Sequence, residues 1–316
     1  MSRPQKVINT RVKIIFSDAK DGLSLDRTVG IGMVNLATIT WALNIVLGRW
    51  LRSYTGPITL AAARFLIASL CFVVILNRLK PEERRLGADR WPLFGMALSG
   101  VAAFSPAIYL GLRYTTAVNA TLITGLSPLI TGLLTGLLIH EQMSGRQVIG
   151  AIISFTGVVA ILFGDSYSFW REIHVNIGDL IVLGAVILWG LYSILGHRVM
   201  RHRSPVSTTA FSAFLGLPFL LLAATWEVQK ISVSLDLKVI LALLFIGIVA
   251  TFIGILSWNA GVRRLGANGA MAFYNTLPLY GVLAGYLFLH ESILLTHLIG
   301  GSLIVSGGLL ASKVRS

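Results

Sequence analysis

Long apolar runs, separated by short polar segments, occupy almost the whole chain from residue 29 onward. A membrane-spanning helix needs roughly 20 mainly apolar residues, and ten runs of about that length follow one another. They cover residues 29–50, 57–77, 91–112, 117–139, 146–164, 178–197, 205–226, 238–261, 268–289 and 293–312. The gaps between them are too short to hold a soluble domain. The pattern therefore predicts an all-α membrane protein whose ten transmembrane helices contact the lipid bilayer.

The second half of this pattern repeats the first, with a shift of 148 to 150 residues. The matched pairs include Trp41 and Trp189, Pro128 and Pro278, His140-Glu141 and His290-Glu291, and Gly150 and Gly300. Because each half holds five spans, an odd number, the second half would enter the membrane from the opposite side. Residues 29–164 and 178–312 are therefore predicted to be inverted five-helix repeats around a central cavity, a design that recurs in secondary transporters.

Composition agrees with a membrane protein, and charge predicts its orientation. The chain is 55% hydrophobic and 12% charged, whereas soluble chains are typically about 25% charged. The formal net charge of +13 comes mainly from short loops, as membrane topology signals do, so nucleic-acid binding is not expected. With both termini inside, nineteen Lys and Arg fall on the inner side and six on the outer side. We therefore expect a cytoplasmic basic tail at residues 1–28, which lacks the features of a signal peptide, and a cytoplasmic end at residues 313–316.

The repeated His-Glu pairs lie at the ends of two spans, and two interpretations compete. A metalloprotease site would need a second His four residues after the first, and neither HEQMSG nor HESILLTH has it. A Glu just before a helix can instead accept hydrogen bonds from free N–H groups and complement the positive end of the helix dipole. We interpret both pairs as structural signals and expect no metal and no cofactor.

Two prolines at matched positions should bend the spans that contain them. Pro128 and Pro278 each remove a backbone hydrogen bond in mid-span and clash with the carbonyl four residues back. Such kinks are tolerated in membrane helices when neighbours satisfy the freed carbonyl. Because the two prolines are equivalent in the inverted halves, we predict paired hinges beside the central cavity.

Aromatic and polar side chains gather near the expected midplane, although Trp usually lies at membrane interfaces. Amides and hydroxyls avoid hydrocarbon unless they face the helix bundle or a wet cavity. The predicted substrate-binding cavity is lined by Thr38, Trp41, Asn44, Ser105, Tyr109, Trp189, Tyr192, Trp258, Asn259, Tyr274, Asn275 and Tyr280.

Arg64 lies about seven residues inside the second span, where a charged side chain is costly and marks a functional candidate. It could meet a substrate carboxylate. Its equivalent in the other half is Ser212, however, and the position is shallow enough for a long side chain to snorkel outward. A structural partner, snorkelling and a substrate carboxylate therefore all remain open for this residue.

The sequence lacks several features that would indicate proton coupling, ATP hydrolysis or enzymatic catalysis. All thirteen Asp and Glu lie in tails, loops or helix ends, whereas proton-driven carriers commonly relay protons through buried acids. The chain also lacks the GxxxxGK[ST] phosphate-binding loop of ATP-driven proteins. No Ser/His/Asp set falls at one membrane depth, so no catalytic residues and no enzyme are expected. The remaining modes of transport are facilitated flow of a solute down its gradient and exchange of one solute for another.

These features together resemble a known family. Each half has a mid-span proline in its fourth helix, followed by an acidic residue before a Gly-rich fifth helix, GAIISFTGVVAIL or GGSLIVSGGLLAS. Over residues 29–312 the chain is similar to the EamA branch of the drug/metabolite transporter superfamily and, more narrowly, to aromatic amino-acid exporters of the YddG type. The resemblance implies a bacterial inner-membrane exporter whose central cavity is built from spans one, three, four, six, eight and nine.

Three hypotheses follow for the function. The first is export of amino acids, aromatic or otherwise apolar, or of similar small metabolites, by alternating access and by a monomer. The second keeps transport but replaces the substrate with phosphorylated sugars, which would need several intramembrane Lys or Arg to neutralise phosphate. The third, from another class, is an intramembrane enzyme or a receptor-like scaffold, for which the short loops leave little room.

Overall fold

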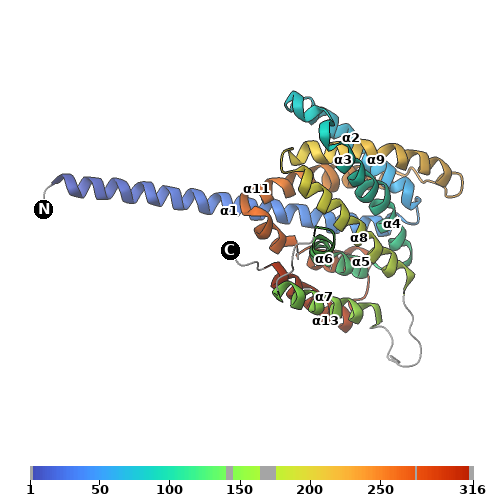
Figure 1. Ribbon diagram of the computed structural model, residues 1–316. Coiled ribbons are helices and arrows are strands. Elements are labelled where there is room, and N and C mark those ends of the chain that lie inside the picture. The colour runs from blue at the N-terminus through green and yellow to red at the C-terminus, as the bar shows by residue number, and fades with distance from the viewer. Residues whose placement is uncertain (1–2, 140–144, 164–175, 275, 313–316) are drawn as a thin grey trace.

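The computed structural model describes residues 3–139, 145–163, 176–274 and 276–312, and within these ranges every regular element is a helix (Figure 1). The α-helices of this part are α1 (Arg3–Leu51), α2 (Pro57–Leu76), α3 (Arg90–Met96), α4 (Phe104–Tyr114), α5 (Ala117–Thr124), α6 (Ser127–Ile139), α7 (Gly145–Phe163), α8 (Ile177–Val199), α9 (Pro205–Glu227), α10 (Leu237–Leu244), α11 (Gly254–Tyr274), α12 (Leu277–Leu289) and α13 (Leu295–Ser312). Two short 3₁₀ helices, η1 (Pro81–Arg84) and η2 (Gly87–Asp89), lead into α3.

Two of the expected spans contain a π-helical segment between two α-helices. The segment η3 (Ala97–Ala103) joins α3 to α4, and η4 (Phe245–Ile253) joins α10 to α11. The two segments occupy corresponding positions of the two halves, since their starts lie 148 residues apart. Because π turns are rare and occur often at functional sites, a matched pair indicates a shared role in the two halves.

The helices identify a multi-pass membrane protein. Among the described residues, seven helical segments are long and apolar enough to cross a membrane, and three shorter apolar helices accompany them. The shorter helices are Val148–Ile161, Leu277–Leu289 and Leu295–Leu310, at the places of the expected fifth, ninth and tenth spans. The helix starts follow local chemistry. Pro57 and Pro205 stand at the first positions of α2 and α9, where the missing N–H of proline costs nothing.

The boundaries differ from the expected spans in two places. Helix α1 begins at Arg3, so the expected tail continues the first span as one helix. No Gly or Pro interrupts residues 5–21, so nothing in that stretch ends the helix. Helix α11 likewise runs through the expected connection between spans eight and nine and ends at Tyr274, close to Pro278, which stands at the start of α12.

The two spans predicted to bend at the matched prolines are each divided into two helices, with the proline in the first turn of the second helix. Span four is interrupted at Gly125 and Leu126, between α5 and α6, just before Pro128. Span nine is interrupted at Thr276, just before Pro278. The two breaks also touch each other, since a Cβ placed on Gly125 would lie 2.7 Å from Cγ of Pro278. Their role as hinges remains a prediction.

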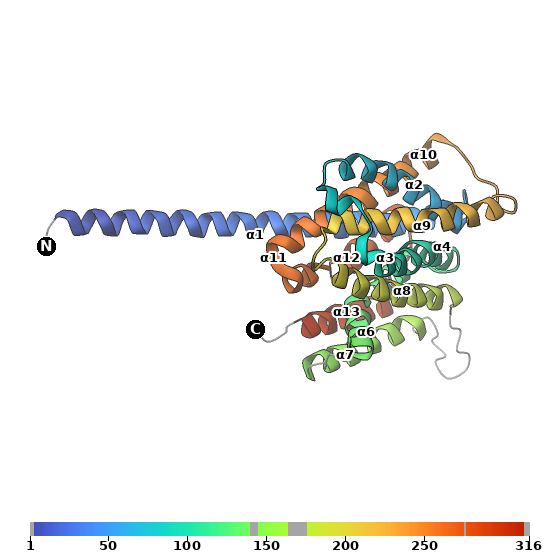
Figure 2. The ribbon, with the colours of Figure 1, turned by 45° about the horizontal axis from the view of Figure 1, so that its top comes forward.

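Helices pack in pairs that take one member from each half. The main pairs are α1 with α11, α2 with α9, α4 with α8, and α7 with α13. Figures 1 and 2 both show α7 and α13 side by side at one edge of the bundle. There the backbones approach closely, because a Cβ on Gly300 would lie 2.6 Å from the carbonyl oxygen of Gly157. Small residues allow this kind of contact between membrane helices.

Two other pairs of helices come close at glycine residues, and the two contacts occupy equivalent positions in the two halves. A Cβ on Gly111 would lie 3.0 Å from the carbonyl oxygen of Gly178, where α4 meets α8. A Cβ on Gly261 would lie 3.1 Å from the carbonyl oxygen of Gly30, where α11 meets α1. Gly111 aligns with Gly261 and Gly178 with Gly30 under the shifts of 150 and 148 residues. Equivalent residues therefore make equivalent contacts in the two pairs.

Candidate functional site

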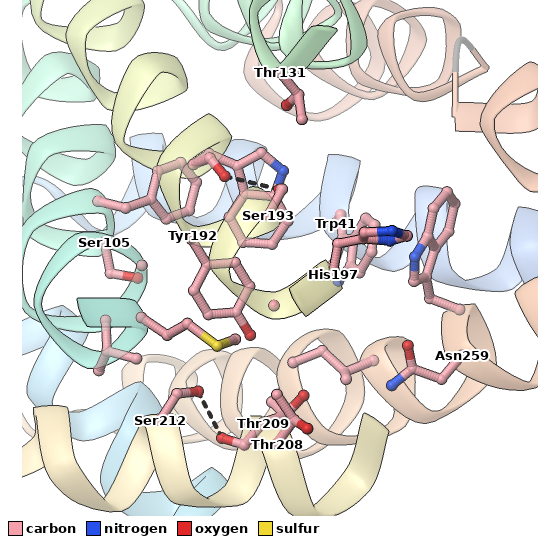
Figure 3. Close-up of a pocket in the computed structure, with 18 of the residues that line it drawn as sticks. Trp41, Ser105, Thr131, Tyr192, Ser193, His197, Thr208, Thr209, Ser212 and Asn259 are labelled. Atoms are coloured by element: carbon pink, nitrogen blue, oxygen red, sulfur yellow. Dashed lines mark hydrogen bonds between the residues drawn. The ribbon is translucent and has the colours of Figure 1, made fainter. Parts of the chain in front are cut away.

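A cavity of about 500 Å³ lies between the two halves. Its wall is mostly apolar and comes from α1, α2, α3, η3, α4, α5, α6, α8, α9, α11 and α12. Figure 3 shows polar side chains distributed around it, including Ser105, Thr131, Tyr192, Ser193 and Asn259. A mainly apolar cavity of this size with a few polar groups is typical of a site for a small molecule.

An aromatic cluster forms one wall of the cavity. The ring centroid of Trp41 lies 5.5 Å from Trp258, 6.1 Å from Tyr274 and 6.5 Å from Trp189. Trp189 in turn stacks on Tyr192, at 5.0 Å and an interplanar angle of 22°. Tilted and stacked pairs at these distances are favourable for aromatic rings. The cluster therefore offers both ring faces and ring edges to an aromatic or apolar ligand.

The π-helical segments hold this cluster in place. The indole Nε1 of Trp41 donates to the carbonyl oxygen of Ala250, in η4, at 3.0 Å. In η3 the absence of a side chain at Gly100 makes room for the ring of Tyr192, since a Cβ there would lie 2.6 Å from Cγ of that ring. Each π segment thus accommodates one large aromatic side chain at the cavity wall.

Arg64 belongs to a buried polar network on α2, α4, α1 and η4. Its Nε donates to Oγ1 of Thr251 at 2.7 Å, and its Nη1 donates to the hydroxyl of Tyr109 at 3.4 Å. The Tyr109 hydroxyl donates to Oδ1 of Asn44 at 2.7 Å. Arg64 is only 8% exposed and lines the cavity, so it points into the protein and does not snorkel. Of the three alternatives for this residue, a structural partner and a substrate carboxylate remain.

Exposed residues line one end of the cavity. Its lining includes His197, Met200 and Arg201, which are exposed at the carboxyl end of α8. At the other end it is lined by Arg64 and Ser105, which are buried. A solute in this conformation would enter or leave beside the end of α8.

Contacts between the two halves lie beyond the buried end of the cavity, farther along α1 and α4. The carboxylate of Glu291 accepts hydrogen bonds from the backbone N–H groups of Ala117 and Val118, each at 2.9 Å. Nε of Arg49 lies 3.7 Å from the same carboxylate, and Nη1 of Arg49 donates to the carbonyl oxygen of Leu112 at 2.6 Å. One carboxylate and one guanidinium thus tie α1, α4 and α5 to the α12–α13 turn. We call the Arg49–Glu291 pair with these backbone partners the closing contact.

The closing contact shows what the second His-Glu pair does. Glu291 caps a helix, as expected, but the helix is α5 of the other half instead of the α13 that follows it in sequence. The chain turns back at His290, whose φ of 53° is left-handed, and this reversal carries Glu291 across to α5. The first pair, His140 and Glu141, lies outside the described residues.

Most of the side chains predicted to line the cavity do line it. They are Trp41, Asn44, Ser105, Trp189, Tyr192, Trp258, Asn259 and Tyr274, and Arg64, the possible partner of a substrate carboxylate, lines the cavity with them. Asn275 lies outside the described residues.

Three predicted residues are not in the lining. Thr38 is buried and its hydroxyl lies 3.2 Å from that of Thr276, while the hydroxyl of Tyr280 donates to Oδ1 of Asn35 at 2.8 Å. Both hydroxyls therefore satisfy contacts between α1 and α12 instead of facing the cavity. Tyr109 lies behind Arg64 and Asn44 and is 2% exposed. Helical spacing alone does not distinguish a cavity face from a polar helix contact.

The lining also includes polar residues that the sequence analysis missed. They are Thr124, Thr131, Thr135, Ser193, His197, Arg201, Thr208, Thr209 and Ser212. Thr131 and Thr135 are four residues apart on α6 and so share a face, a signal that could have found them. The remaining residues lie near helix ends or stand among apolar residues of the sequence. There, no spacing of polar residues indicates which face of the helix they occupy.

Comparisons with known proteins agree with a membrane transporter. The model of the EamA-like transporter family matches residues 28–163 and again residues 176–313. The transporter YyaM of Bacillus subtilis, named as uncharacterized, is 29% identical over 272 residues, which are 85% of this chain and 88% of that protein. A Salmonella typhimurium protein named "Probable amino-acid metabolite efflux pump" is 25% identical over 282 residues, 86% of this chain and 91% of that protein.

A solved structure has the same fold. It is described only as "Crystal structure of protein", and it superposes with a TM-score of 0.61 over 91% of this chain and 97% of that chain at 22% sequence identity. The two family matches together cover nearly all of the described helices. The chain belongs to the EamA-like transporter family.

Proposed function

We propose that this protein is a secondary transporter that exports amino acids, aromatic or otherwise apolar, and similar small metabolites. The observation that carries this proposal is the cavity of about 500 Å³ between the two halves, walled by Trp41, Trp189, Trp258 and Tyr274. Small-molecule sites usually span about 300–1,000 Å³ and are mostly apolar with a few polar groups. The name of the Salmonella relative, an amino-acid metabolite efflux pump, supports the same substrate class, as does the resemblance to aromatic amino-acid exporters of the YddG type.

The mechanism we propose is alternating access between two inverted five-helix halves, with ten spans in all. The cavity reaches the surface beside the carboxyl end of α8, and the closing contact seals the other end. The matched approaches of Gly111 to Gly178 and of Gly261 to Gly30 support a twofold relation between the halves. If the two halves exchanged their conformations, the end of the cavity that is open here would close and the other end would open.

We further propose a monomer in the bacterial inner membrane with both termini in the cytoplasm, as the distribution of Lys and Arg favours. In this orientation the open end of the cavity faces the cytoplasm, where an exporter takes up its substrate. Transport would be facilitative, because the acidic residues of the sequence lie in tails, loops or helix ends. The family to which the chain belongs consists of transporters, and we assign no catalytic step to it.

Efflux from proteoliposomes tests the proposal. Vesicles containing the purified protein are loaded with labelled phenylalanine, tryptophan, methionine or threonine, and release is followed with and without a pH gradient. We expect efflux of the aromatic and apolar amino acids above that of protein-free vesicles, and no dependence on the gradient. Equal release from both kinds of vesicle for all four amino acids would remove the amino-acid assignment. Strong competition by sugar phosphates would favour the phosphorylated-sugar alternative instead.

A further inference from the structure

Hydrogen-bond donors without partners gather at the buried end of the cavity. The hydroxyl of Ser105 is fully buried, lines the cavity and has no hydrogen-bond partner among the described residues. Ser105 lies one helical turn from Tyr109 on the same face of α4, and Tyr109 contacts both Arg64 and Asn44. Buried polar groups are nearly always paired, so each exception needs a physical explanation. An orphan hydroxyl beside this network indicates that a ligand supplies its partner.

The free groups of Arg64 and Asn44 in this network are hydrogen-bond donors. The Tyr109 hydroxyl accepts from Arg64 and therefore donates its own proton to Oδ1 of Asn44. This fixes the Asn44 amide so that its NH₂ group is free, and within the described chain neither that group nor Nη2 of Arg64 has an acceptor. Arg64, Asn44 and Ser105 all line the cavity. The free groups of Arg64 and Asn44 can only donate, and the Ser105 hydroxyl can donate as well, so the set favours a ligand that accepts hydrogen bonds.

The charge at this end is also uncompensated. Across the described residues, no Asp or Glu forms an ion pair with Arg64, and its side chain is 8% exposed. A buried guanidinium without a counter-ion is costly in a membrane protein. Its planar fork of N–H groups matches a carboxylate in two parallel hydrogen bonds. A ligand with a single negative charge would accept the free hydrogen bonds of the network and neutralise the charge of Arg64.

We infer that Arg64, Asn44 and Ser105 form a subsite for the carboxylate group of the transported solute, with Tyr109 and Thr251 as positioning residues. This inference rests on the proposed function and deepens it, because it makes the carboxylate a required part of the substrate. The apolar part of the solute then lies toward Trp41 and the rest of the aromatic cluster. The substrate class is a small monocarboxylate with an aromatic or apolar body, and an amine or alcohol of the same shape should bind poorly.

Ligand binding to the purified full-length protein in nanodiscs tests the subsite. The probes are phenylalanine, 3-phenylpropionate, which keeps the carboxylate and lacks the amine, and 3-phenylpropanol, which lacks both. Calorimetry should show that the two carboxylates bind and that the alcohol binds about tenfold to a hundredfold more weakly, as expected for a lost hydrogen bond to a charged group. The variant Arg64→Gln should remove this preference, whereas Arg52→Gln, at a half-buried arginine outside the cavity lining, should keep it.

A pair of serine variants gives a sharper comparison, because neither removes a hydrogen bond within the protein. Ser105 and Ser69 both have buried hydroxyls without partners in the described chain, and only Ser105 lines the cavity. We expect Ser105→Ala to weaken carboxylate binding by about tenfold and to leave 3-phenylpropanol binding unchanged. Ser69→Ala should change neither. Both proteins should stay folded, which thermal unfolding checks independently.

The outcomes separate the subsite from the proposed function. Equal affinities for 3-phenylpropionate and 3-phenylpropanol, with Ser105→Ala equal to Ser69→Ala, would overturn the carboxylate subsite while leaving transport of apolar solutes intact. If none of the three probes binds and no amino acid leaves proteoliposomes, both the subsite and the proposed function are overturned. A carboxylate preference lost in Arg64→Gln and reduced in Ser105→Ala supports the subsite.

Discussion

The substitution Glu291→Gln should weaken the closing contact. The Glu291 carboxylate accepts from two backbone N–H groups, one per oxygen and each at 2.9 Å, and lies 3.7 Å from Nε of Arg49. A glutamine keeps one carbonyl oxygen but replaces the other with an NH₂ group, which cannot accept. The variant therefore loses one hydrogen bond to a charged acceptor and the ion pair, without losing side-chain volume.

The expected size of this effect follows from those contacts. A hydrogen bond to a charged group contributes about 1.5–3 kcal/mol, and a partly exposed ion pair adds about 0–1 kcal/mol. The arrangement with this end closed should therefore lose about 1.5–4 kcal/mol, which shifts its ratio to the opposite arrangement by roughly 10-fold to 1,000-fold. If alternating access is correct, a state hardly populated in the parent protein becomes measurable.

Pulsed EPR distances across the closed end measure the shift. Spin labels replace Tyr114 on α4 and Phe288 on α12, which are 55% and 66% exposed, in a protein whose single cysteine, Cys71, is changed to Ala. We expect Glu291→Gln to add a component at longer distance. A distance distribution identical to that of the parent protein would refute the assignment of the closing contact as a gate.

A second carboxylate provides a matched control. Glu227 on α9 caps α2 in the same way, accepting from the N–H groups of Ile58 at 3.1 Å and Thr59 at 2.6 Å. It joins α2 to α9 and, among the described residues, forms no hydrogen bond or ion pair with α1, α4 or α5. Glu227→Gln should lower the thermal stability without adding the longer distance. The appearance of the same component in both variants would mean that general destabilisation, and not gating, produces it.

Two further predictions concern helix packing and the aromatic cluster. Gly300→Ala places a Cβ 2.6 Å from the carbonyl oxygen of Gly157, so it should cost about 1–3 kcal/mol of stability and lower the temperature of unfolding. Gly184→Ala, which meets nothing within 4 Å, should leave that temperature unchanged or raised. Trp189→Ala removes a ring that stacks at 5.0 Å on its neighbour and should raise the KM for aromatic solutes about tenfold, for a loss of about 1.5 kcal/mol. Trp226→Ala, at a ring that is 68% exposed, should leave the KM unchanged, and equal effects of the two substitutions would contradict a binding role for the cluster.

The helical architecture was largely predictable because it depends on local sequence. Apolar runs of the length of a bilayer marked most of the helices, and Pro128 and Pro278 marked the two breaks, since proline affects the backbone wherever it occurs. The repeat was visible in matched residues, and equivalent glycines of the two halves make equivalent contacts in the structure. These features need no knowledge of which helices are neighbours.

The site was predictable only in part, because it depends on contacts between distant segments. The π segments were not predicted, since nothing in their residues differs from ordinary apolar helix. Tyr280 was assigned to the cavity on residue type, but its hydroxyl reaches Asn35, a partner 245 residues away. Glu291 was recognised as a helix cap, yet which helix it caps follows from the packing of the two halves. Polar residues in apolar runs can be found from sequence, while their partners cannot.

The hydrogen bond from Trp41 to Ala250 restricts how this protein can evolve new substrates. The indole N–H donates to a carbonyl oxygen of the π segment η4 at 3.0 Å, so a phenylalanine at this position would remove a hydrogen bond to the main chain inside the bilayer. In the part of the chain that the structure describes, the side chains of Trp258 and Tyr274 form no such bond to the backbone. Natural selection should therefore alter substrate preference through these two rings, while the tryptophan at position 41 stays fixed by the needs of the main chain.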